Sequence, residues 1–122
     1  MSYDVFFQGF IAGEASSLGG VQMREVMAPH VISGAGAHVR IRFGDGEADL
    51  CLSEDGMMAN HISGRDPWQL LFVGAQAANW VILPLDGPLC LTAPGQREEL
   101  PEELTDHVVF IESGADLLEV IT

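Results

Sequence analysis

The sequence contains no lysine and only five arginines, against eighteen aspartates and glutamates, so its formal charge is −13 over 122 residues. Nucleic-acid binding relies on clustered basic side chains that neutralise phosphates, and here the arginines are scattered among carboxylates. An anionic membrane surface is disfavoured for the same reason. We therefore expect neither a nucleic-acid nor a membrane partner. A basic protein fits the charge better.

Long hydrophobic runs are also missing, since no apolar stretch approaches the roughly 18–20 residues that a membrane span requires. The apolar segment 5–12 is interrupted by Gln8, follows Asp4 and lacks the basic flank of a signal peptide. We therefore expect a cytoplasmic protein in which Cys51 and Cys90 are free thiols. The length fits a single domain over residues 1–122, and a hydrophobic fraction of 48% is enough for a folded core.

Motifs for the common site chemistries are absent. None of the four histidines is spaced from another by two or four residues, and there is no Cys-x-x-Cys pair. The run Asp45, Glu47, Asp49 begins like a calcium loop, but Leu50 occupies the sixth position, where that loop requires glycine. No phosphate-binding glycine loop precedes a helix. We therefore expect no cofactor, no metal and no catalytic residue that a motif would identify.

Hydrophobic periodicity and turn residues predict an α+β domain. Strands are expected at 3–10, 39–43, 48–52, 57–62, 80–83 and 108–111, with 89–91 as a short return strand. Helices are expected at 21–27, 66–79 and 114–121, a helical turn at 94–99, a loop at 13–20 and a flexible connection at 33–37. The expected order is β-α-β-β-β-α-β-β-α, with one mixed or mostly antiparallel sheet and helices packed on one face.

The clearest local pattern is a hairpin around Asp45-Gly46, because that dipeptide favours a two-residue turn. A turn there would place Phe43 opposite Ala48. On the polar face it would place Arg42 opposite Asp49 and Arg40 opposite Cys51.

Two helix starts can be predicted from capping residues. Asp66, Pro67 and Gln69 have the spacing of a capping box with proline in the first turn. Ser113 is positioned to cap the final helix, and Asp116 suits the positive end of its dipole.

Carboxylates that the predicted fold does not require nominate two interaction surfaces. The first is the hairpin region, with Asp45, Glu47, Glu54 and Asp55. The second is an acidic ridge, with Glu98, Glu99, Glu102, Glu103 and Asp106. Each surface either binds a basic partner or serves only as a solubilising coat.

The sequence leaves a second function open, a small enzyme or ligand-binding domain with a pocket between the sheet and the 67–79 helix. Its lining would be His61, Arg65, Trp68, Arg40, Arg42 and Cys51. An arginine near Cys51 would favour its thiolate, but no base is expected nearby. A homodimer is compatible with either function, through an apolar patch of Met57, Met58 and Phe10.

Several segments carry a resemblance to a known family. They are Ser2-Tyr3-Asp4-Val5-Phe6-Phe7-Gln8, His61-Ile62-Ser63-Gly64 with residues 66–71, residues 80–92, and Leu100-Pro101-Glu102-Glu103-Leu104. Together they make most of the chain resemble a family of small acidic bacterial proteins of unknown function. The resemblance transfers no catalytic residue. By analogy of class, it suggests an immunity-like partner of a toxin.

Overall fold

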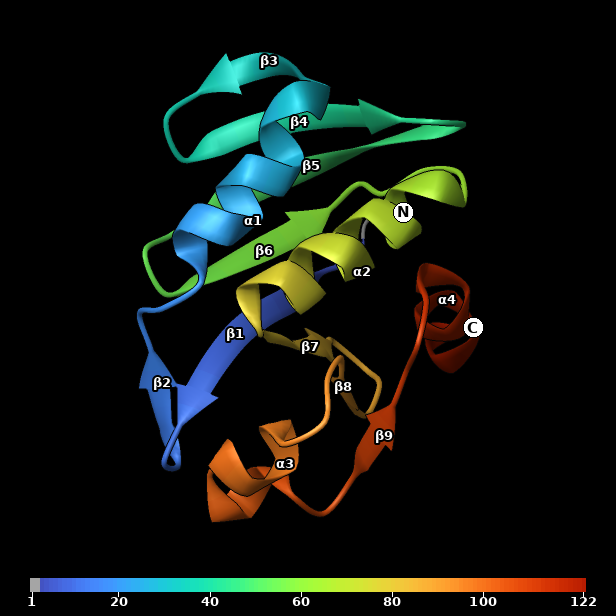
Figure 1. The fold of residues 1–122 in the computed structure, drawn as a ribbon. Helices are drawn as coiled ribbons and strands as arrows, with labels where there is room; N and C mark the ends of the chain where they lie inside the picture. The colour runs from blue at the N-terminus through green and yellow to red at the C-terminus, as the bar shows by residue number, and fades with distance from the viewer. Residues whose placement is uncertain (1–2) are drawn as a thin grey trace.

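The computed structural model describes residues 3–122, so Ser2 of the quoted N-terminal motif lies outside the described residues. A sheet of nine strands carries three longer helices on one face (Figure 1). The strands are β1 (Val5–Ile11), β2 (Glu14–Ser16), β3 (Val31–Ala35), β4 (His38–Phe43), β5 (Gly46–Leu52), β6 (Gly56–Asn60), β7 (Val81–Pro84), β8 (Leu89–Leu91) and β9 (Val108–Phe110). The helices are α1 (Gly20–Met27), α2 (Asp66–Ala78), α3 (Gln96–Glu99) and α4 (Gly114–Ile121), with short 3-10 turns at Ala28–His30 and Glu102–Leu104.

The α+β class and the mixed, mostly antiparallel sheet are confirmed. The strand order is β3-β4-β5-β6-β1-β7-β8-β9, with β2 paired to the far end of β1. Among the strand pairs within residues 3–122, only β8–β9 is parallel. Two strands were not predicted: β2 lies in the expected loop 13–20, and β3 begins at Val31 and extends into the expected connection 33–37. In β3, Gly34 adopts a positive φ of 97°, which allows the strand to pair despite an irregular register.

The main core lies between the sheet and the helices α1, α2 and α4. Val5 and Phe7 project into it from β1, Met57 and Ala59 from β6, and the buried face of α2 closes it. Helix α2 ends at Asn79, whose left-handed conformation lets its N–H bond to the carbonyls of Ala75 and Gln76. Ser113 caps α4 as predicted, since its Oγ accepts from the Asp116 N–H.

The other face of the sheet, here called the outer face, is covered only in part. A second, smaller cluster lies on it, built from Val81, Leu89 and Leu91 under Leu100. The short segment from α3 through the 102–104 turn therefore packs on the side opposite the longer helices. Over β1, β5 and β6, alternate side chains of the strands point away from the main core and from the helices α1, α2 and α4 that pack on it.

The hairpin register differs from the prediction by two residues. Its turn is Gly44-Asp45, so Phe43 pairs with Gly46, Arg42 with Glu47, and Arg40 with Asp49. Gly44 takes the positive φ that the first turn position requires. Gly46 is instead packed under the backbone of Ser63, where a side chain would clash. A shift of two preserves which face each side chain occupies and changes only its partner.

Candidate functional site

The four carboxylates predicted for the hairpin do not form one cluster. Asp45 and Glu47 lie at the first end of β5, while Glu54 and Asp55 lie in the turn that follows its last residue. A seven-residue strand separates the two pairs by roughly 20 Å, at about 3.3 Å per residue. Each pair therefore needs its own explanation.

Asp45 caps helix α2 from outside the helix. Its carboxylate accepts from the backbone N–H of Asp66 at 2.8 Å and of Arg65 at 2.9 Å, and these bonds lower the pKa of Asp45. The predicted capping box does not form, because the Asp66 carboxylate accepts from the Asp45 N–H and Gln69 Oε1 accepts from the Gly114 N–H. Asp45 thus has a structural function that joins the hairpin to α2.

A charged network covers the β4–β5 part of the outer face. Arg40 Nε donates to Glu47 at 2.6 Å and Arg40 Nη1 to Asp49 at 2.5 Å, while Arg42 Nη2 donates to Glu47 at 2.9 Å. The hydrogen bonds from Arg40 and then Arg42 lower the pKa of Glu47. Burial alone would raise the pKa of Asp49, but Arg40 and His61 outweigh it and lower that pKa. The negative charge of this region is therefore largely balanced.

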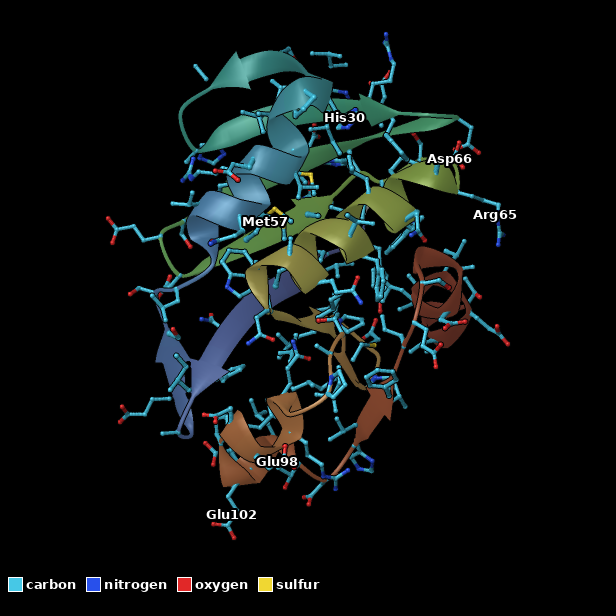
Figure 2. The ribbon with its side chains drawn as sticks, viewed as in Figure 1. His30, Met57, Arg65, Asp66, Glu98 and Glu102 are labelled. Atoms are coloured by element: carbon cyan, nitrogen blue, oxygen red, sulfur yellow. The ribbon has the colours of Figure 1, made fainter. Side chains whose placement is uncertain are left out.

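The six residues predicted for a pocket do not converge between the sheet and α2. Trp68 is only 5% exposed and packs into the main core, which fills that space with apolar side chains. Arg65 is exposed beside the start of α2 (Figure 2). The other four, Arg40, Arg42, Cys51 and His61, belong to the outer face, where His61 Nδ1 lies 2.9 Å from Asp49 Oδ2.

A thiol–imidazole pair on the outer face was missed in the sequence. Cys51 Sγ lies 3.9 Å from His38 Nε2, because the observed register pairs these two residues. The predicted register paired Cys51 with Arg40, so a correct assignment of the Gly44-Asp45 turn would have revealed the pair. The second thiol, Cys90, instead donates to the Pro88 carbonyl, and burial raises the pKa of Cys90 to about 11.

The acidic ridge comprises Glu98, Glu99, Glu102, Glu103 and Asp106, carried by α3 and the turn after it. Figure 2 shows Glu98 and Glu102 at the opposite end of the molecule from Arg65 and Asp66. Glu99 is half-buried and structural, since its Oε2 accepts from the Ala12 N–H at 2.5 Å. The other four are exposed, and no ion pair found within residues 3–122 involves them.

Gln96 positions the ridge. Its side chain is 5% exposed, and its Oε1 accepts from the N–H of Thr92 at 2.7 Å and of Ala93 at 3.2 Å. Its Nε2 donates to Asn79 Oδ1 at 3.0 Å, which ties α3 to the end of α2. A buried, satisfied amide of this kind holds a short helix in one place, where α3 alone would not be stable.

Neither a metal site nor a membrane-spanning helix is found in the described part of the chain. Within residues 3–122, no three histidine, cysteine, aspartate or glutamate side chains are arranged to hold one metal ion. No helix there is long and apolar enough to cross a bilayer. No protein-family model matches the chain, and no curated protein or solved structure is significantly similar to it.

Proposed function

We propose that this protein is a non-enzymatic protein-interaction module, immunity- or inhibitor-like, that acts in the cytoplasm and uses the acidic ridge to bind a basic protein. The observation that carries the proposal is the unequal use of carboxylates. Asp45, Glu47, Asp49 and Glu99 each hold part of the fold, whereas the four exposed ridge carboxylates do not. Their charge is available to a partner.

The electrostatics of the whole chain support the same proposal. A formal charge of −13 with no lysine gives a long-range attraction for cations. Such a field accelerates association with a basic protein and disfavours acidic partners, and it is screened by salt. The ridge would then provide the contact surface within a field that the whole molecule generates.

The test is to capture partners on the immobilised protein and measure their association rates. The proposal expects a basic protein whose association slows steeply as salt rises, because steering is screened. Retention of only neutral or acidic proteins at low salt would contradict it. A homodimer is compatible with the proposal, and sedimentation at two protein concentrations tests for one.

A small thiol enzyme or ligand-binding domain is the second candidate, and the contact between Cys51 and His38 favours it. An imidazole next to a thiol can accept its proton and generate the nucleophilic thiolate. Iodoacetamide tests this, with Cys90 as the internal control because its thiol is buried and its pKa is raised to about 11. The candidate expects Cys51 to react much faster than Cys90 and to slow in His38→Ala. If Cys51 reacts equally fast in His38→Ala, the thiol-enzyme candidate is ruled out.

A further inference from the structure

A row of large apolar side chains crosses the uncovered part of the outer face. The registers place Cys51 beside Met58, Met58 beside Phe6, and Phe6 beside Leu83, over the neighbouring strands β5, β6, β1 and β7. Together with Phe10, these residues line a groove of about 380 Å³, which we call the outer groove. The Phe6 side chain is 42% exposed there.

The outer groove is unusual because antiparallel strands with one solvated face normally place polar residues on it. On β1, the outward positions are Phe6, Gln8 and Phe10, while Val5 and Phe7 on the same strand are buried in the main core. Strand β1 is therefore apolar on both faces around Phe6. Clustered apolar surface that no element of residues 3–122 covers marks an interaction site more often than chance exposure.

Carboxylates stand at both ends of the outer groove. At one end, the carbonyl oxygen of Asp55 accepts from Gln8 Nε2 at 2.7 Å, which fixes the Asp55 turn beside the groove. At the other end, Leu83 borders both the groove and a second hollow that Glu103 and Asp106 line. On the β4 side of the row, Cys51 pairs with His38, and Arg40, two positions along β4, is already bonded to Glu47 and Asp49. The groove thus combines an apolar floor with acidic ends.

We propose that the outer groove binds a segment of the basic partner in which large apolar side chains are flanked by lysine or arginine. This rests on the proposed function and extends it, because it supplies the apolar anchor that a charged ridge alone lacks. A second copy of this chain is a poorer occupant, since its own groove would bring two more acidic ends against these. Contact with the apolar floor of the groove would supply most of the affinity. The carboxylates at its two ends would orient the bound segment and raise its association rate.

Three synthetic peptides of equal length test the inference by methyl NMR of the full chain. One alternates leucine with lysine, one alternates serine with lysine, and one alternates leucine with glutamate. We expect only the leucine–lysine peptide to shift the methyl resonances of Met58 and Leu83. We also expect Phe6→Ser to lower the affinity for that peptide about tenfold, as for the loss of an anchor side chain. Val73→Ser, at a site 40% exposed on α2, should leave the affinity for the peptide unchanged.

The outcomes separate this inference from the proposed function. If lysine peptides perturb only the ridge, the outer groove is not a binding site and the ridge proposal stands. If Phe6→Ser and Val73→Ser lower the affinity for the peptide equally, the assignment of the outer groove as the binding site is wrong. If the Met58 and Leu83 resonances shift with protein concentration alone, a second copy occupies the groove and the inference is overturned. Met58→Gln replaces Phe6→Ser if that variant does not fold.

Discussion

The charged network on β4 and β5 and the acidic ridge are both rich in carboxylates. The carboxylates of the network are paired with arginines, whereas those of the ridge, within residues 3–122, are not. In the network, Glu47 and Asp49 are bonded to arginines on the neighbouring strand. On the ridge, Glu98, Glu102 and Glu103 are exposed and outside the ion pairs of residues 3–122. The comparison shows that carboxylates in one small protein can have different roles, even when all of them add to the same net negative charge. Part of it holds strands together, and part is left for solvent or a partner.

The largest effect is expected from Gln96→Leu, which removes the buried amide that holds the ridge in place. Thr92 and Ala93 then lose the acceptor for their N–H groups, and Asn79 loses a donor. Unpartnered buried polar groups cost about 1–3 kcal/mol each, so we expect a loss of about 2–3 kcal/mol in the free energy of unfolding. Urea denaturation measures it. Gln76→Leu, on the exposed side of α2, is the matched control and should cost clearly less.

A smaller loss is expected when the network itself is broken. Arg40→Leu removes the bonds to both Glu47 and Asp49 and leaves two carboxylates close together. Exposed ion pairs contribute about 0.2–1 kcal/mol each, so we expect a loss of about 1 kcal/mol at low salt and less at high salt. Arg97→Leu is the control, because Arg97 is an exposed arginine of α3 that takes part in no ion pair found within residues 3–122. If both variants lose the same stability, the two regions do not differ as described.

Acid should weaken the hairpin region through carboxyl groups whose pKa values are lowered by folding. The pKa values of Asp45 and Glu47 lie below their ordinary values of 3.8 and 4.5. A lowered pKa contributes stability above the ordinary value, and that contribution is lost as pH falls through the folded value. We therefore expect unfolding to become easier below about pH 4. Asp45→Asn/Glu47→Gln should be less stable at neutral pH and less sensitive to acid. An unchanged acid slope would contradict this account.

The smallest effect on stability is expected on the ridge. Glu98→Gln/Glu102→Gln/Glu103→Gln removes three exposed charges that belong to no ion pair found within residues 3–122. Because the molecule carries an excess of negative charge, removing some of it reduces self-repulsion. Thermal melting should therefore be unchanged or slightly raised. A clear fall in the melting temperature would show that the ridge carboxylates belong to the fold, as those of the network do.

Much of the fold could be predicted because its information is local. Ser113 caps α4 through its own side chain, and Asn79 ends α2 where the periodic pattern stops. The hairpin was predicted at the right place, but its register depended on a distant contact. Gly46 packs under Ser63 and Asp45 reaches the start of α2, and neither partner is near in sequence. Tertiary packing therefore selects the Gly44-Asp45 turn over the adjacent Asp45-Gly46 turn that the sequence predicted.

The candidate site could be predicted only where it is a continuous segment. The ridge is such a segment, and the bond from the Ala12 N–H to the Glu99 side chain is a structural role that the sequence neighbours of Glu99 do not indicate. The outer groove is assembled from four strands, and β1 is apolar at consecutive positions, so alternation could not show which side remains open. Of the predicted apolar patch, all three residues border the groove, but Met57 is only 4% exposed and belongs to the main core.

The most direct test of the central claim compares two variants with the same net charge on one captured basic partner. Glu98→Gln/Glu102→Gln/Glu103→Gln neutralises the ridge. Glu25→Gln/Glu112→Gln/Glu119→Gln neutralises three exposed carboxylates elsewhere. If the ridge is the contact surface, the first variant loses the partner and its salt dependence, while the second changes only the association rate, and slightly. Equal retention of the partner by both variants would contradict the account.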